Sequence, residues 1–176
     1  KDAWDVSDSG DGSVMAWVVP NGDKYDLYIG ADGQIMGNKD CSELFADYES
    51  LEKIDFNGCF NTEMVEDMRK MFSNCGELQE LDISSFNTKN VQDMQKLFKN
   101  CESLLSINVS HFNTSKVINM ESMFEDCKEL VYIDVSNFNT RRVERFTAMF
   151  RNCLNLVAVD VSNFNTVSAT NMASMF

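Results

Sequence analysis

The chain has 176 residues, which is long enough to bury one sizeable hydrophobic core. Its 28 acidic residues outnumber its 15 basic ones, and the net charge of −13 excludes nucleic acid as a partner, because phosphate binding needs a basic surface. No apolar run approaches the roughly 18 residues that cross a membrane, so we expect no membrane insertion. The chain starts without a secretory leader and ends within a repeat, so we expect a piece of a longer protein, truncated at its C-terminus.

Residues 1–40 do not share the pattern of the rest of the chain, and we expect them to form a small antiparallel β cap. Residues 13–19 and 24–29 are rich in strand formers, and a Pro-Asn-Gly-Asp turn at 20–23 joins them. The first unit of a repeat array needs a cover over its apolar groups and strand edges, which is the role we assign to this sheet. A separate recognition domain is the alternative.

From residue 41 to residue 176 the sequence repeats with a period of 26 residues, in about five units. A Phe-Asn-Thr motif and a closing phenylalanine both return at this step. The motif phenylalanines are Phe60, Phe86, Phe112, Phe138 and Phe164, and the closing ones are Phe72, Phe98, Phe124, Phe150 and Phe176. A fixed period of roughly 20 to 50 residues is typical of a solenoid, in which each unit buries its apolar face only against its neighbours.

Each repeat combines two apolar periods, and we predict a strand followed by a helix. Leu81 and Ile83 alternate with polar residues, as in a short strand with one buried face. Further on, apolar residues recur at the spacing of one helical stripe. These residues are Val91, Met94, Leu97, Phe98 and Cys101. The predicted fold is an α/β repeat with short parallel strands on one face and helices on the other.

The repeat resembles two known patterns. The motif L-x-x-L-x-I-x-x-F-N at residues 78–87 is similar to the leucine-rich-repeat consensus, which implies a leucine-rich-repeat solenoid. More closely, LDISSFNT at 81–88 and IDVSNFNT at 133–140, each followed by a closing phenylalanine, resemble the 26-residue repeats of BspA-like bacterial surface proteins. This resemblance covers residues 41–176. It implies a surface-exposed or secreted bacterial protein, an adhesin or host-interaction module, and supplies no catalytic residues.

Two columns of strand residues form the candidate binding face, because alternation points them away from Leu81 and Ile83. The candidates are Asp55, Glu80, Asp82, Ser106, Asn108, Tyr132, Asp134 and Asp160. Stacked strands lie about 4.8 Å apart, so neighbouring carboxylates repel by on the order of 1 kcal/mol even in water. Hydrogen bonds to neighbouring turns, a cation or a basic partner would offset this repulsion. Tyr132 is the best anchor for a partner, because exposed aromatic side chains are favoured at interfaces.

Four cysteines form another regular column, one per repeat. They are Cys75, Cys101, Cys127 and Cys153. A disulfide needs Cα atoms within about 7 Å, whereas neighbouring helices pack roughly 8–10 Å apart, so we expect buried free thiols. There is no Cys-x-x-Cys pair, and we expect no metal site. Outside the column, a bridge between Cys41 and Cys59 is an alternative to two free thiols.

No acid–base pair, nucleophile or glycine-rich phosphate loop emerges from the repeats, so we expect neither catalysis nor a cofactor. The sequence favours a noncatalytic module at the bacterial cell surface, or secreted, that binds a host or extracellular protein or glycan through the strand face. Adhesion is the role that this interpretation favours. The alternative is a structural spacer that holds another domain away from the cell wall.

Overall fold

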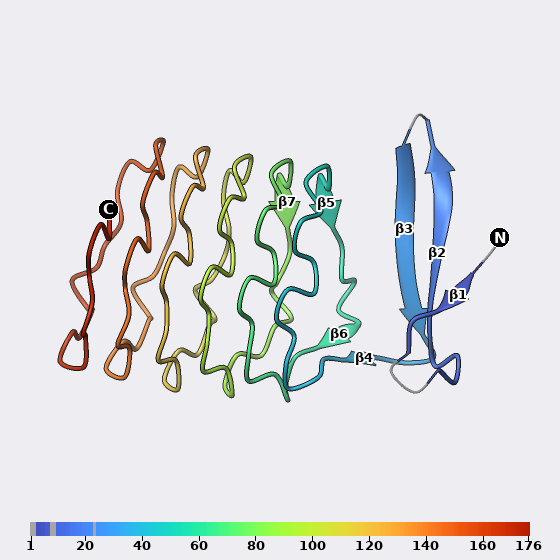
Figure 1. Ribbon diagram of the computed structural model, residues 1–176, viewed down its shortest axis with the longest axis horizontal. Coiled ribbons are helices and arrows are strands. Elements are labelled where there is room, and N and C mark those ends of the chain that lie inside the picture. Colours follow the sequence, from blue (N-terminus) through green and yellow to red (C-terminus); the bar gives the residue numbers. More distant parts are fainter. Residues whose placement is uncertain (1–2, 8–9, 23) are drawn as a thin grey trace.

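The computed structural model describes residues 3–7, 10–22 and 24–176. The start of the chain at Lys1 and the end of the expected turn at Asp23 lie outside the described residues. At the N-terminal end, β1 (Trp4–Asp5), β2 (Val14–Asn21) and β3 (Lys24–Ala31) form an antiparallel sheet in the order β1-β2-β3 (Figure 1). Trp17 and Tyr28 lie opposite each other in β2 and β3, and their rings stack with centroids 5.6 Å apart.

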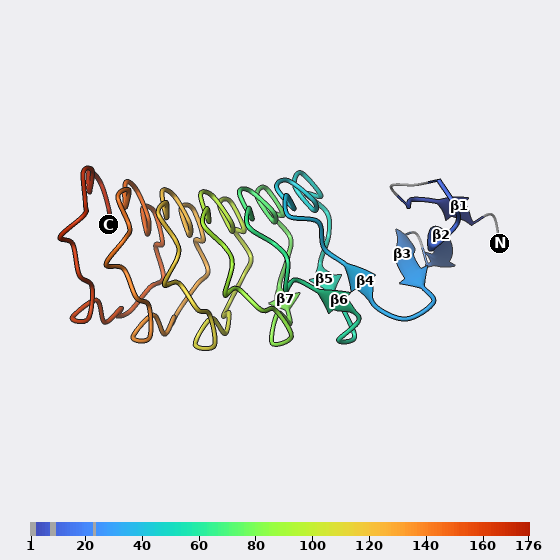
Figure 2. The same ribbon diagram turned by 90° about the horizontal axis from the view of Figure 1, so that it is seen from below.

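The rest of the chain winds in coils that stack side by side along the long axis of the molecule, as Figure 1 and Figure 2 show. The first coils meet through a parallel pair, β4 (Ile35–Met36) with β6 (Phe60–Asn61). A second parallel pair joins β5 (Lys53–Ile54) to β7 (Glu80–Leu81). Later coils meet through single parallel bridges, such as Ser106 with Tyr132.

The described residues contain no helix, so the predicted α/β repeat with helices on one face is wrong. The same finding overturns the leucine-rich-repeat solenoid with helices that the resemblance implied. In the predicted helix the chain instead forms overlapping turns, in which the N–H groups of Leu97, Lys99 and Cys101 each donate to the carbonyl three residues earlier at 3.2 Å. Lys96 and Asn100 adopt left-handed conformations, with φ of 57° and 59°. Two left-handed residues four positions apart interrupt an α-helix.

The other N–H groups of this segment bind the next coil. They donate to its carbonyls at 2.8–3.0 Å. The pairs are Met94 with Asn119, Lys96 with Glu121, Phe98 with Met123, and Asn100 with Glu125. Backbone donors are therefore satisfied alternately within the coil and across the stack. The segment joins its neighbour as a parallel strand would while it turns the chain. The predicted stripe still faces the core, because overlapping turns also bring every third or fourth residue to one side.

A column of phenylalanines runs through the centre of the stack. It consists of Phe45, Phe72, Phe98, Phe124, Phe150 and Phe176, and consecutive rings stack with centroids 5.5–5.8 Å apart. Met94 of the predicted stripe belongs to the same core, as do Met68 and Met120 at the equivalent positions of the neighbouring coils, and all three are fully buried. Burial of one such side chain contributes roughly 1.5–3 kcal/mol. The hydrophobic core is therefore continuous from coil to coil.

Gly37 marks the entry into the stack. A Cβ at this position would meet Val65 Cγ2 at 2.9 Å, and Asn61 O and Cys41 Sγ at 3.2 Å, so only glycine fits. The Gly37 N–H donates to Asn61 O at 2.8 Å. Stacking thus begins near Ile35, before residue 41, where the repeat becomes visible in the sequence. The capping role of residues 1–40 and the count of about five repeats stay predictions.

Candidate binding face

The strand face is the set of exposed residues where consecutive coils meet through β5, β7 and the bridges that follow. It holds all eight predicted site residues. Asp55, Glu80, Asp82, Ser106, Asn108, Tyr132 and Asp160 are exposed, and Asp134 is half-buried. Ile83 and Ile107, which alternate with them along the chain, are buried in the core. The structure therefore brings the predicted residues together in two adjacent rows, and their binding role stays a prediction.

Every residue of the acidic row accepts a hydrogen bond from the backbone two residues later. In each case the Oδ1 atom accepts an N–H group at 2.8–3.1 Å. The pairs are Asp55 with Asn57, Asp82 with Ser84, Asn108 with Ser110, Asp134 with Ser136, and Asp160 with Ser162. Such local turns hold the short side chains in one direction. Of the three offsets considered for the repulsion in this row, the structure supplies hydrogen bonds, but these come from the residue's own turn and not from a neighbouring one.

These hydrogen bonds also favour the charged form of three aspartates in the acidic row. The backbone N–H and the hydroxyl of Ser84 lower the pKa of Asp82 below its usual value. Equivalent contacts, of which the serine hydroxyl is the stronger, lower the pKa of Asp134 and Asp160. At neutral pH Asp82, Asp134 and Asp160 are therefore negative charges, with the uncharged Asn108 between the first two, and they suit the ammonium and guanidinium groups of a partner.

The second row changes its chemistry along the stack. It starts with Lys53 and Glu80, whose charged ends pair at 2.7 Å. It continues with Ser106, Tyr132 and Ala158. Tyr132 is 62% exposed although it bridges to a coil on either side. An aromatic side chain that stays so exposed inside a packed array is typical of a contact residue.

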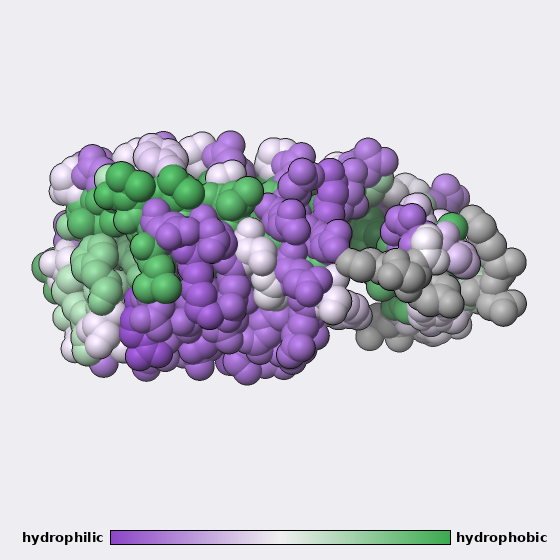
Figure 3. Space-filling view, turned by 90° about the horizontal axis from the view of Figure 1, so that it is seen from above, coloured by the Kyte–Doolittle hydropathy of each residue, from purple (hydrophilic) through white to green (hydrophobic). Residues whose placement is uncertain are grey.

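A third row lies directly before the second one, and the sequence reasoning missed it. At this position Gln79 is followed by Leu105, Val131 and Val157, which are 55%, 46% and 83% exposed. We call Leu105, Val131 and Val157 the apolar row. Figure 3 shows hydrophobic residues gathered on the later coils and hydrophilic residues on the earlier ones. A comparison of equivalent positions between repeats would have found this row, because a polar residue there gives way to apolar ones.

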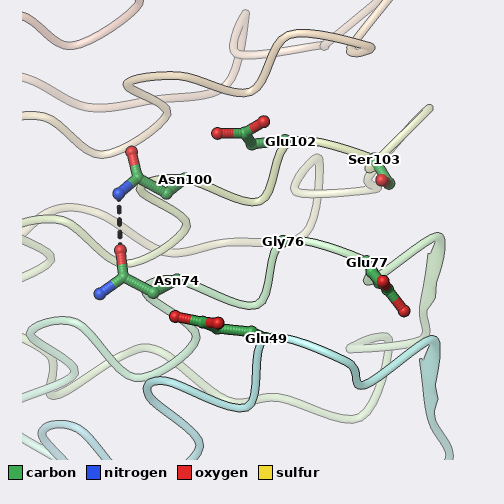
Figure 4. A pocket seen from close by; sticks show the side chains of 7 residues that line it. All are labelled: Glu49, Asn74, Gly76, Glu77, Asn100, Glu102 and Ser103. Atoms are coloured by element: carbon green, nitrogen blue, oxygen red, sulfur yellow. Dashed lines mark hydrogen bonds between the residues drawn. The ribbon is translucent and has the colours of Figure 1, made fainter.

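An open hollow of about 460 Å³ lies near the apolar row, on the earlier coils (Figure 4). Its lining residues are Glu49, Asn74, Gly76, Glu77, Asn100, Glu102 and Ser103. Gly76 leaves the hollow open, because an added Cβ would meet only Glu49 O, at 3.8 Å. Asn100 Nδ2 donates to Asn74 Oδ1 at 2.6 Å along one side. Glu102 pairs with Lys128 at 2.8 Å, but Glu49 and Glu77 still make the hollow negative, so it suits an ammonium or guanidinium group.

The cysteine column lies inside the stack. Cys75, Cys101 and Cys127 are fully buried and Cys153 is half-buried, so the predicted burial is confirmed for three of the four. The Sγ atoms of Cys101 and Cys127 donate to phenylalanine carbonyls of the preceding coil at 3.2 Å. Burial raises the pKa of these thiols, and that of Cys75 to about 11, so they are poor nucleophiles. All six cysteines are free, and the alternative bridge outside the column is not formed.

A comparison with protein-family models identifies the family to which the chain is related. Residues 39–156 and 105–176 match the family described as "Mycoplasma protein of unknown function, DUF285", so the matches together cover residues 39–176. The chain belongs to this family. The membership supports a bacterial surface repeat protein, and the description of the family names no ligand and no activity.

Two further comparisons add no relative. No curated protein and no solved structure matches this member of the family. Among the residues that the structure describes, no helix has the length and apolarity needed to cross a membrane. Within the same residues, no group of three or more His, Cys, Asp or Glu side chains is arranged to hold a metal ion.

Proposed function

We propose that the chain is a noncatalytic binding module of a bacterial surface protein, and that it contacts a host or extracellular protein or glycan through the strand face. The observation that supports this most is the exposure of Leu105, Val131 and Tyr132 in coils that have neighbours on both sides. Large apolar side chains that stay in water beside a packed core mark interaction sites. The carboxylates of the acidic row supply polar contacts around this centre. Adhesion is the role that we propose for the contact.

Binding to a panel of purified extracellular-matrix proteins and mucin glycans tests the proposal. The variant Tyr132→Ala with Glu80→Ala removes the aromatic anchor and one carboxylate of the second row. We expect it to abolish capture without lowering the melting temperature, because both side chains are exposed. Val167→Ser is the matched control, since Val167 is exposed but lies outside the strand face. Capture that survives the double substitution would overturn the proposal.

A structural spacer is the second candidate, and the phenylalanine column favours it. Rings stacked through consecutive coils make a stiff array whose length grows with the number of repeats. Such an array can present another domain without any ligand of its own. One reproducible ligand from the panel, lost on substitution of Tyr132, would remove this candidate.

A further inference from the structure

The surface just before each strand changes from mostly charged to apolar along the stack. The position of Glu49 is occupied by Gly76, Glu102 and Lys128 in the following coils and by Leu154 in a late one. The second row runs from Lys53 and Glu80 to Tyr132. The position of the apolar row changes likewise, from Gln79 to Leu105, Val131 and Val157, and Figure 3 shows hydrophobic residues gathered on the later coils. A partner that covers the whole surface must therefore offer two kinds of side chain.

The apolar row presents side chains and no free strand edge. The Val131 N–H donates to Leu105 O and the Val157 N–H donates to Val131 O, both at 3.2 Å. Because these backbone groups are paired between coils, a partner cannot add a strand here. It must contact the row through apolar side chains of its own. Covering three large exposed side chains removes apolar surface from water at roughly 25 cal/mol per Å².

The hollow beside Gly76 gives the surface of the earlier coils a defined shape. Glu49, Glu77 and Glu102 line it, and Lys128 pairs with Glu102 at 2.8 Å on the side of the later coils. The coil of Gly76 and the coil of Val131 are two steps apart in the stack, which is roughly 10 Å at the spacing of paired strands. A cationic group in the hollow and apolar groups on the row thus lie within reach of one short segment.

We infer that this surface docks a protein segment that is cationic at one end and apolar at the other. A lysine or arginine of the segment enters the hollow, and its apolar side chains cover the apolar row. The inference rests on the proposed function and names the partner class. Glu102 is already paired with Lys128, whereas Glu49, Glu77 and the net charge of −13 attract a cationic segment and repel an acidic one. The same charge repels a second copy of the chain, which excludes self-association as the preferred use of this surface.

A labelled synthetic peptide with lysines at one end and leucine and tyrosine at the other is the probe. Its matched peptide carries glutamate in place of lysine. We expect the lysine peptide to bind the native chain about tenfold or more tightly than the glutamate peptide, and to lose affinity as salt is added. Fluorescence anisotropy at two salt concentrations measures both effects.

Two variants separate the two halves of the surface. Leu105→Ser with Val131→Ser removes most of the apolar row, and Gly76→Gln fills the hollow with a neutral side chain. Each should weaken binding of the lysine peptide by about tenfold. Val167→Ser with Glu144→Gln changes one apolar and one acidic residue outside this surface and should leave binding unchanged. Circular dichroism spectra that match the native chain establish that every variant is folded.

Equal affinity for the two peptides overturns the inference, as does full affinity after Leu105→Ser with Val131→Ser. A matrix protein or neutral glycan that binds through Tyr132, while the lysine peptide fails to bind, overturns the partner class and leaves the proposed function standing. If neither the panel nor the peptide binds, both the inference and the proposed function are overturned.

Discussion

At the scale of single residues, left-handed backbone conformations at two positions of each coil decide how the chain turns. The residues at the first position are Glu43, Lys70, Lys96, Ser122, Ala148 and Ser174, and those at the second are Asp47, Asn74, Asn100, Asp126 and Asn152. Asn and Asp adopt this conformation more readily than other side chains. The residues at the first position therefore carry a conformational cost in every coil.

Glycine at the first left-handed position should stabilise the folded chain. Lys96→Gly should raise the free energy of unfolding by about 1 kcal/mol, because glycine adopts the left-handed conformation without a steric cost. Lys96→Val should lower it, since a β-branched side chain fits this conformation worst. Urea denaturation measures both changes. Lys116→Gly is the control, because Lys116 has an ordinary backbone conformation, and a gain at Lys116 equal to that at Lys96 would contradict the explanation.

Glu125 is a buried carboxylate held between basic residues of the two neighbouring coils. Its side chain is 2% exposed, its Oε2 accepts Lys99 Nζ at 2.6 Å, and its Oε1 pairs with Arg151. Burial raises the pKa of Glu125, but hydrogen bonds from Lys99 and Ser122 and the two nearby positive charges outweigh burial, so the pKa lies below its usual value. The triad therefore ties three consecutive coils together in its charged form.

Glu125→Gln should lower the free energy of unfolding by about 2 kcal/mol at neutral pH, because two basic side chains lose a charged partner. The pKa of Glu125 is lower in the folded chain than in the unfolded one. Its stabilisation is therefore complete above the usual glutamate pKa and is lost as the pH falls through the folded-state value. Urea denaturation at decreasing pH should show the gap between native chain and variant closing. Glu129→Gln, at an exposed glutamate, is the control, and a gap that stays constant with pH would contradict the role of the charge.

At the scale of the coil, Gly37 and Gly76 have opposite surroundings, which the sequence alone does not reveal. Gly37 is enclosed by Val65, Asn61 and Cys41, whereas the space beside Gly76 is open. Gly37→Ala should lower the free energy of unfolding by about 2 kcal/mol, because the backbone must move to admit the methyl group. Gly76→Ala should leave it unchanged or raise it by about 0.5 kcal/mol, since alanine restricts the unfolded chain. Thermal denaturation of the pair tests this contrast, and equal losses at both glycines would contradict the packing at the entry.

The coil also shows how far sequence reasoning reached and where it stopped. The spacing of Met94, Phe98 and Cys101 indicated correctly which side chains face the core, because the spacing of apolar residues shows which of them lie on the same side of the chain. The helix was wrong because overlapping turns produce nearly the same periodicity. Left-handed conformations distinguish the two structures, and residues such as Lys96 and Ala148 do not signal them in a sequence. Side-chain direction could thus be predicted, whereas the hydrogen-bond pattern could not.

At the scale of the whole molecule, a regular core carries an irregular surface. The phenylalanine column repeats with little change from coil to coil, while the second row and the row that holds Leu105, Val131 and Val157 change from polar to apolar. The two rows of the strand face were predictable, because alternation along a strand decides which side chains point outward. The apolar row and the hollow were not found, because both depend on differences between repeats. Gly76 is such a difference, since other coils have a side chain at this position.

The central claim is that the strand face and the apolar row make the contact with a partner. Hydroxyl-radical footprinting of the native chain, with and without a ligand selected from the panel, tests it most directly. We expect the ligand to protect Tyr132 and Leu105 from oxidation, while Met64 and Tyr28, which are also exposed, stay reactive. Protection of Met64 or Tyr28 with Tyr132 still fully reactive would place the contact elsewhere and contradict the account.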